Sequence, residues 1–510
     1  MKPPRRLLAF VLPMVGWIAL YSSPAQEARE RTVRLPDSDA NWKRARLYVE
    51  ETPDADYRHA SAAAHEAFRD LKFGVRVHWG LYSIGGRPAE SWPFLSMSNE
   101  ERQRYQQLYR TWNPSRFNAE EWVALFERAG ARCFAFTAKH HEGFSMFDTQ
   151  TRVRRRVNWT AAGGPAIEEC DLAYSIAETP FRRDVVRELA DASHRHGLKI
   201  DLYFSHPDWY DADFRPWGFH PLQRPGAPDA EAVAKRQGRP LAFATEPTDA
   251  EEGRMLARHR DQLRELLTNY GTIDMVCLDI SLGARVWPQL KATLKELRAL
   301  QPDVMFRARG IGNYGDYYTP EGFVPGSKEP TAMPWMVISA LGRSFSYEPE
   351  ATKYKGAQWI VRNLIETVAK GGNFMVGVGP DATGSFHPAA AAQLEQTGAW
   401  LRTNAEGIYA TRPRDGDDWR EGDNIRFTRS KDAKIVYAFA QAWPGDELTL
   451  RTVRTRAGST VRLLGYPPAL AWRHDAERGL IVALPRELQE TAQRPSPFAH
   501  TFRIEVDSSP

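Results

Sequence analysis

The side chain best placed for chemistry is one carboxylate, Asp279, inside the apolar run 275–280. Five apolar residues around a single acid, with Gly271 before the run and Gly283 after it, are typical of a buried parallel strand. In a barrel of parallel strands, catalytic side chains emerge at the carboxyl ends of the strands. An Asp that only caps the following turn is the alternative interpretation. The case for Asp279 therefore depends on what lies at the other strand ends.

Further polar residues end or follow the neighbouring apolar runs. They are His78 and Trp79, His140 and His141, Tyr203, Arg309, and Glu321 in the loop after Arg309. A lone histidine is usually structural, but several histidines with Tyr, Arg and two carboxylates indicate a convergent polar site. Neutral histidines, Arg and Trp suit the hydroxyl groups and ring faces of a sugar, and cleavage of a glycosidic bond needs a pair of carboxylates.

Apolar periodicity predicts strands that alternate with amphipathic helices. The predicted strands cover residues 73–79, 133–137, 199–205, 275–280, 304–309, 336–341 and 373–378, and the predicted helices cover 59–70, 121–129, 183–196, 248–269, 287–300, 354–370 and 388–404. This alternation predicts an α/β fold with a parallel sheet, a (β/α)8-like TIM barrel. Two long segments, 152–179 and 206–246, follow strand ends, where loops that shape a substrate site belong.

The pattern changes after residue 408. Short alternating runs without helical periodicity begin near residues 425, 434, 448, 460, 480 and 502. They predict a β-sandwich over residues 409–510, after a catalytic barrel over residues 26–408. A chain of 510 residues exceeds the size of one hydrophobic core, so two domains are expected.

The first 25 residues have the pattern of a signal peptide. Lys2, Arg5 and Arg6 precede the apolar run 7–20, and small residues lead to Ala25. That run is too short for a comfortable membrane span, so we expect a periplasmic or secreted protein without stable membrane association after removal of residues 1–25. The net charge of +4 is spread along the chain, and the only basic run, 152–156, is short. We therefore expect no nucleic-acid partner.

The cysteines and histidines do not form a known metal or disulfide pattern. The chain has three cysteines, and it contains neither a CxxC nor a His-Glu-x-x-His motif. We expect no disulfide framework, no metal and no cofactor.

An ordered set of motifs carries a family resemblance. The motifs are 72–83, 117–122, 137–144, 203–205, 270–274 leading to Asp279, 371–384 and 407–409. Over most of its length the chain resembles glycoside hydrolase family 29, the retaining α-L-fucosidases. The resemblance implies a catalytic (β/α) barrel, a C-terminal β-sandwich, a fucosylated glycan as substrate, and no metal in the chemistry.

The resemblance also implies roles for residues. Asp279 is expected to be the nucleophile, His78, His140, His141 and Tyr203 to bind the sugar, and Trp79 and Arg309 to be their neighbours. In a retaining mechanism, the nucleophile forms a glycosyl ester while an acid protonates the leaving oxygen and later activates water. We expect Glu321 to be this acid/base, with Glu329 and Glu90 as the other candidates.

The chain departs from the family pattern at three positions. Many relatives have Trp at the position of Cys277, Gly at that of Ile280, and Glu, which some of them use as the acid/base, at that of Met336. These departures leave a related sugar such as α-L-galactose, or a carbohydrate-binding pseudoenzyme, as alternatives. An esterase or phosphatase is disfavoured because the sequence has neither a Gly-x-Ser-x-Gly elbow nor a metal-ligand cluster. The sequence leaves the linkage preference and the oligomeric state open.

Overall fold

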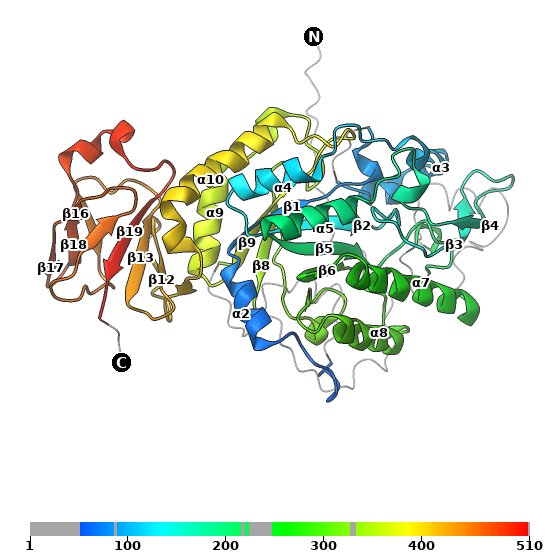
Figure 1. The fold of residues 1–510 in the computed structure, drawn as a ribbon, viewed down its shortest axis with the longest axis horizontal. Coiled ribbons are helices and arrows are strands. Elements are labelled where there is room, and N and C mark those ends of the chain that lie inside the picture. Colours follow the sequence, from blue (N-terminus) through cyan, green and yellow to red (C-terminus); the bar gives the residue numbers. More distant parts are fainter. Residues whose placement is uncertain (1–50, 86–88, 216–219, 224–246, 327–332, 508–510) are drawn as a thin grey trace, which may run out of the picture.

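A parallel sheet of seven strands forms the centre of the larger part of the chain (Figure 1). The computed structural model describes residues 51–85, 89–215, 220–223, 247–326 and 333–507. Along the sheet the strands are β7 (Met305–Phe306), β6 (Met275–Asp279), β5 (Lys199–Ser205), β2 (Cys133–Lys139), β1 (Phe73–Val77), β9 (Asn373–Val378) and β8 (Met336–Ala340). The predicted signal peptide and Glu329 lie outside the described residues.

An irregular segment lies between the two edge strands of this sheet. Arg307 bridges Tyr317, Tyr318 bridges Trp335, and Glu321 bridges Ile338, all in parallel. The segment 317–321 therefore occupies the eighth place and connects β7 to β8. The regular part of β7 is shorter than the predicted run 304–309, because the chain beyond Phe306 pairs with this segment only at isolated positions.

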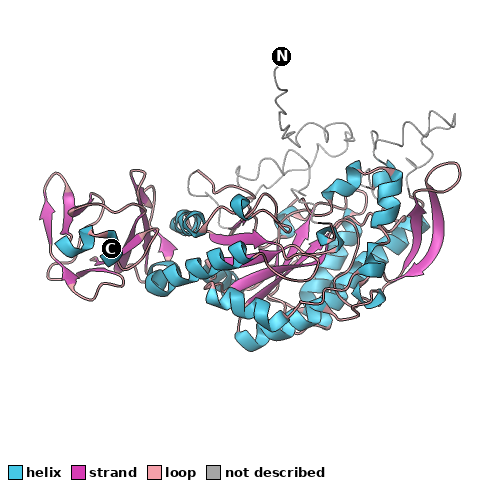
Figure 2. Cartoon of the chain, turned by 90° about the horizontal axis from the view of Figure 1, so that it is seen from above, coloured by secondary structure: helices cyan, strands magenta, loops and turns pink. Residues whose placement is uncertain are grey.

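Helices connect the strands and lie around them (Figure 2). They are α2 (Ala62–Asp70), α3 (Asn99–Tyr105), α4 (Ala119–Arg128), α5 (Val185–His196), α7 (Asp249–Thr268), α8 (Trp287–Leu300), α9 (Ala357–Ala369) and α10 (Pro388–Ile408). Local sequence signals fix several ends, for example the side chain of Asn118, which accepts hydrogen bonds from the first turn of α4. These helices confirm the predicted (β/α) barrel.

The barrel interior below the strand ends is filled largely by sulfur-containing side chains. Cys133, Met275, Met305, Met336 and Met375 pack together there with almost no exposed area. Methionine adapts to irregular gaps, which suits the interior of a barrel whose eighth strand is irregular. Cys133, Cys170 and Cys277 are all free thiols.

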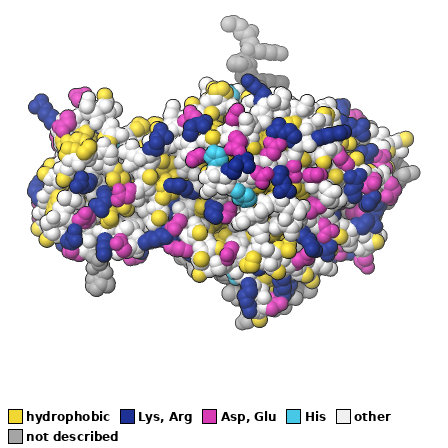
Figure 3. Space-filling model, viewed as in Figure 1, with side chains coloured by type: hydrophobic (Ala, Val, Ile, Leu, Met, Phe, Trp, Pro, Cys, Tyr) yellow, Lys and Arg dark blue, Asp and Glu magenta, His cyan; other side chains and the backbone are white. Residues whose placement is uncertain are grey.

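The long segment after β2 is structured. It contains an antiparallel hairpin of β3 (Val153–Asn158) and β4 (Ala166–Leu172), which projects at the end of the molecule away from the C-terminus (Figures 1 and 2). The basic run 152–156 lies on this hairpin, where Arg152 pairs with Asp171 and Arg156 with Glu168. Positive and negative side chains are interspersed over the face of the molecule in Figure 3.

The C-terminal part forms two antiparallel sheets. One contains β10 (Arg412–Pro413), β11 (Arg420–Glu421), β12 (Ile425–Arg429), β13 (Ile435–Ala440), β19 (His500–Glu505), β15 (Val461–Leu463) and β16 (Ala469–Leu470), and the other contains β14 (Glu447–Leu450), β18 (Gly479–Ala483) and β17 (Trp472–Asp475). Phe427 and Phe502 of the first sheet share one apolar core with Leu448 and Leu480 of the second. This arrangement confirms the predicted β-sandwich.

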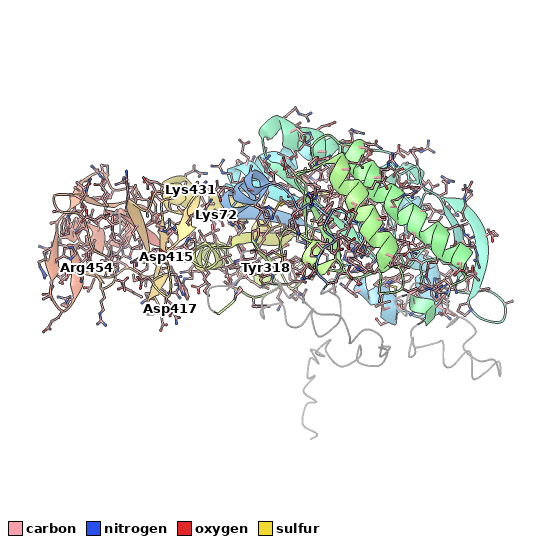
Figure 4. The ribbon with its side chains drawn as sticks, turned by 90° about the horizontal axis from the view of Figure 1, so that it is seen from below. Lys72, Tyr318, Asp415, Asp417, Lys431 and Arg454 are labelled. Atoms are coloured by element: carbon pink, nitrogen blue, oxygen red, sulfur yellow. The ribbon has the colours of Figure 1, made fainter. Side chains whose placement is uncertain are left out.

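Charged residues join the two parts. Arg412 and Lys431 of the C-terminal part pair with Asp70 of α2, both at 2.7 Å, and Arg426 pairs with Glu366 of α9. Lys72 lies beside this junction, near Lys431 (Figure 4). Within the described part of the chain, no helix combines the length and apolar character that a membrane span requires.

Candidate active site

Asp279 is the last residue of β6 and lies among the carboxyl ends of the strands. Tyr203 on the adjacent β5 donates from its hydroxyl to Asp279 Oδ2 at 2.8 Å, and Arg309 donates from Nη1 to Oδ1 at 3.0 Å. Burial opposes ionisation of this carboxyl, but the Arg309 and Arg307 guanidiniums hold its pKa well below the usual range. Asp279 is therefore an oriented and ionised carboxylate, the state that a nucleophile needs.

Glu321 lies at the end of the segment 317–321, and it shares a guanidinium with Asp279. Its Oε2 is 2.5 Å from Arg309 Nη2 and 3.7 Å from Arg307 Nη2. Arg309 thus contacts Asp279 through Nη1 and Glu321 through Nη2. The side chain of Glu321 is 33% exposed, against 9% for that of Asp279. The structure therefore brings the two expected carboxylates together, with Glu321 on the side open to solvent.

His141 has hydrogen-bonding capacity that the protein does not use. The residue is fully buried, and neither ring nitrogen has a hydrogen-bond partner among the described residues. Its Nε2 is 3.7 Å from Asp279 Oδ2. Burial, with the neighbouring His140, holds its pKa well below the usual range, so the ring is neutral, with one donor and one acceptor nitrogen. Buried polar groups normally have partners, and the hydroxyl groups of a bound sugar would provide them.

His140 lies between two polar side chains and the rings of His141 and Tyr203. Its Nδ1 is 2.5 Å from Ser91 Oγ and 3.6 Å from Glu142 Oε2. The ring lies 4.4 Å from that of His141 and 5.4 Å from that of Tyr203, between centroids. Ser91 and Glu142 therefore orient His140.

His78 differs, because protein groups occupy both of its nitrogens. Arg76 donates from Nε to His78 Nε2 at 2.9 Å, and Nδ1 lies 2.9 Å from Thr137 Oγ1. Since Arg76 can only donate, Nε2 is the acceptor and Nδ1 carries the proton. Burial and the Arg76 charge keep the pKa of His78 well below its usual range. His78 thus presents its ring, rather than a free nitrogen, to the site.

The tryptophans are arranged differently from the sequence-based expectation. Trp79 is fully buried, its indole contacts the rings of Trp112 and Trp122, and Nε1 donates to the backbone oxygen of Asp381. The structure does not bring Trp79 to the polar cluster. Trp92 and Trp209 instead lie beside His141, with centroids 4.5 Å and 5.3 Å away. Sequence reasoning missed both, although each lies in a loop that follows a strand.

Two further buried arginines contact the site, and neither was assigned a role from the sequence. Arg76 lies in the middle of β1, and Arg307 follows β7 with no exposed area. Arg76 is a single charge in an otherwise apolar run, the same signal that singled out Asp279, and Arg307 lies near the end of the predicted strand 304–309. Both point into the barrel and contact site residues.

Glu90 is a third carboxyl near the site. It is buried, and its Oε1 accepts a hydrogen bond from the backbone nitrogen of Ser346 at 2.8 Å. Burial raises its pKa, and neighbouring His140 only partly opposes this. Ala89 and Glu90 have positive φ angles of 84° and 51°. Non-glycine residues pay for such conformations, which cluster at functional sites.

Two further observations delimit the site. Among the described residues, no group of three or more His, Cys, Asp or Glu side chains is placed to hold a metal ion. A separate cavity of about 730 Å³ lies at the amino-terminal ends of β5 to β7, where Lys199, Asp274 and Met305 line it. This cavity is at the opposite end of the barrel from Asp279.

Comparison with known proteins agrees with this geometry. A family model described as "Alpha-L-fucosidase" matches residues 42–406, and one described as "Alpha-L-fucosidase C-terminal domain" matches residues 420–505. The plasma α-L-fucosidase of Homo sapiens is 27% identical over 440 residues, which cover 82% of this chain and 85% of that protein. The tissue α-L-fucosidase of Homo sapiens is 26% identical over 497 residues, or 90% and 92% of the two chains.

Solved structures give the same result. The α-L-fucosidase isoenzyme 1 from Paenibacillus thiaminolyticus has a TM-score of 0.70 and 26% identity, and the match covers 87% of this chain and 100% of that one. An α-L-fucosidase GH29 from Bacteroides thetaiotaomicron has a TM-score of 0.69 and 21% identity, with coverage of 90% and 98%. Because the first family model spans more than half of the chain, this protein belongs to the α-L-fucosidases of glycoside hydrolase family 29.

Proposed function

We propose that this chain releases terminal α-L-fucose from oligosaccharides or glycoconjugates with retention of configuration. The observation that carries the proposal is the pair of carboxylates, Asp279 and Glu321, held by the two terminal nitrogens of Arg309. A shared guanidinium keeps the carboxyls close. This favours the separation of about 5 to 5.5 Å of retaining enzymes over the wider spacing that an inverting enzyme needs to admit water.

The first step forms a bond between Asp279 and the anomeric carbon. Asp279 attacks this carbon while the Glu321 carboxyl gives its proton to the leaving oxygen, so the glycosidic bond breaks and a fucosyl ester forms. Glu321 then takes a proton from water, which attacks the same carbon and frees Asp279. His141 and His140 are buried, which supports binding of one sugar at a chain end rather than an internal sugar.

Glu90 is the second candidate for the acid. A proton donor must be protonated before the reaction, and burial raises the pKa of Glu90. Glu321 remains our first choice because it is in direct contact with the guanidinium that holds Asp279. Glu329 lies outside the described residues.

Export is the remaining part of the proposal. Residues 1–25 have the charged, apolar and small-residue pattern of a signal peptide, so we propose a periplasmic or secreted enzyme.

The stereochemistry of the first product tests the mechanism. Hydrolysis of an aryl α-L-fucoside is followed by proton NMR from the first minutes. We expect α-L-fucose to appear first and the β anomer to follow by mutarotation. Early β-L-fucose would establish inversion, and binding of fucose without hydrolysis of any α-L-fucoside would establish a pseudoenzyme. The matching α-L-galactoside, assayed in parallel, tests whether the related sugar is preferred.

A further inference from the structure

Below Asp279, two buried guanidinium groups meet at one sulfur atom. Cys277 lies two residues before Asp279 in β6, and its side chain is almost fully buried. Arg307 Nη1 lies 3.0 Å from Cys277 Sγ, and Arg76 Nη1 lies 3.4 Å from it. A guanidinium has no acceptor, so the sulfur accepts in both contacts.

Arg307 continues from this sulfur to the carboxylate pair. Its Nη1 lies 3.5 Å from Asp279 Oδ1, its Nη2 lies 3.7 Å from Glu321 Oε2, and its Nε donates to Thr319 Oγ1 at 2.7 Å. The position of Arg307 therefore influences both the charge and the orientation of Asp279.

Arg76 continues from the same sulfur to the other side of the site. Its Nε donates to His78 Nε2 at 2.9 Å, and its guanidinium lies over the ring of Tyr203, 4.9 Å from the centroid. Tyr203 is itself a hydrogen-bond donor to Asp279. Both arginines thus connect Cys277 to groups that contact the nucleophile.

Cys277 is the group in direct contact with both cations. Two like charges buried side by side repel each other strongly, so they need an acceptor to hold them in place. Asp201 is also buried nearby and interacts electrostatically with both guanidiniums, but among the described residues its side chain hydrogen-bonds to Tyr317 and forms no ion pair with either arginine. The sulfur is therefore the shared partner of Arg76 and Arg307.

We propose that Cys277 is a positioning residue, which fixes Arg307 against the carboxylate pair and Arg76 against His78. The inference rests on the proposed fucosidase reaction. Without an acceptor at position 277, the two guanidiniums separate and Asp279 loses its alignment with the anomeric carbon. The sugar-binding nitrogens of His140 and His141 do not depend on this contact, so binding of the ground state is preserved.

The test compares Cys277→Ala with Cys277→Ser, which restores an acceptor, and with Cys133→Ala. Cys133 is a matched control, because it is an equally buried thiol of the barrel interior that contacts neither arginine. For Cys277→Ala we expect kcat on an aryl α-L-fucoside to fall about 10- to 100-fold, because small misplacements of reacting groups have large effects on rate. KM, and the Kd of fucose measured by calorimetry, should stay within about twofold of wild type. Cys277→Ser should recover most of kcat, and Cys133→Ala should lower Tm without changing kcat.

The outcomes separate this inference from the proposed function. If the wild-type enzyme is active and Cys277→Ala keeps its kcat, the inference is overturned and the proposed function is not. The inference is also overturned if Cys277→Ser does not recover the lost kcat, or if Cys277→Ala and Cys133→Ala lose kcat equally. A wild-type protein that neither hydrolyses fucosides nor binds fucose would overturn both. If Cys277→Ala does not fold, Cys277→Val fills the space without an acceptor and replaces it in the comparison.

Discussion

The hydrogen-bonding state of each histidine decides what that residue can do for a sugar. His141 has two buried nitrogens without protein partners, whereas both nitrogens of His78 are used by the protein. Both rings lie near Asp279, yet the consequences of removing them should differ.

We expect His141→Ala to lower kcat/KM on a fucoside by about 10²-fold, because a sugar hydroxyl loses its partner in a desolvated site and the contact tightens in the transition state. His78→Ala should instead show the larger loss of Tm, since the buried Nε of Arg76 loses its acceptor. Steady-state kinetics and thermal melts of the two variants provide the comparison. Normal kinetics with a lowered Tm for His141→Ala would show that His141 has a structural role and does not bind the sugar.

The acid/base can be assigned by the dependence on the leaving group. If Glu321 is the acid/base, Glu321→Ala should retain the first step on an activated aryl fucoside, because that leaving group needs little protonation. The fucosyl ester should then accumulate, and azide should restore turnover and give the α-configured fucosyl azide. The same assays on Glu90→Ala provide the comparison. Azide rescue of Glu90→Ala, and not of Glu321→Ala, would transfer the role to Glu90.

Single residues show where reasoning from sequence reaches its limit. Asp279 and His141 could be selected because a polar residue at the end of an apolar strand must face the barrel opening, and Glu321 because it is a carboxylate in the loop that follows Arg309. Trp79 also follows a strand, but the turn after it directs the indole toward Trp112. That direction depends on tertiary packing, which strand position alone does not encode. Arg76 could have been found by the rule that identified Asp279, since it is a single charge in an apolar strand.

Among the elements, the helices and buried strands follow local signals closely. The predicted ranges 287–300 and 373–378 match α8 and β9, and Asn118 caps α4. The segment 317–321 could not be predicted as part of the barrel, because it is held by isolated bridges to neighbours rather than by a regular strand pattern. The element that carries Glu321 was thus the one with the weakest local signal.

The cap of α4 gives a test at this scale. Asn118 Oδ1 accepts hydrogen bonds from the backbone nitrogens of Glu120 and Glu121 at 3.1 and 3.3 Å. Asn118→Ala should destabilise the protein by about 1 kcal/mol and lower Tm by roughly 1 °C, with kcat/KM unchanged. Asn118→Ser, which keeps a capping oxygen, is the control for scanning fluorimetry. Equal Tm values for all three proteins would show that the cap does not stabilise α4.

Across the whole molecule, the junction between barrel and sandwich contains a buried amine. Lys72 is almost fully buried, and Asp70, Glu66, Arg412 and Lys431 lie close by. Burial lowers its pKa from 10.5 to about 7. Between pH 7 and pH 10.5 the unfolded chain binds more protons at Lys72 than the folded protein does. Burial of Lys72 therefore lowers the free energy of unfolding at pH 7, and this free energy increases as the pH rises.

We therefore expect Lys72→Met to raise Tm at pH 7 by at least about 2 °C, and this gain to shrink as the pH approaches 10. Lys431→Met is a control at the same junction, because Lys431 is partly exposed and paired with Asp70. Thermal melts between pH 6 and 10 make the comparison. A gain for Lys72→Met that did not change with pH would show that Lys72 is not a buried charge in the native protein.

The central claim is that Asp279 forms a covalent bond to the sugar during turnover, and trapping tests it most directly. In a 2-fluoro-fucosyl fluoride, the fluorine at carbon 2 slows both formation and hydrolysis of the fucosyl ester. Fluoride is a good leaving group, so the ester still forms and then accumulates. Mass spectrometry of the intact protein and of its peptides should show one added 2-fluoro-fucosyl group per chain, located on Asp279 and absent from Asp279→Asn. An adduct on another residue, or hydrolysis of fucosides without any adduct, would contradict the assignment of Asp279 as the nucleophile.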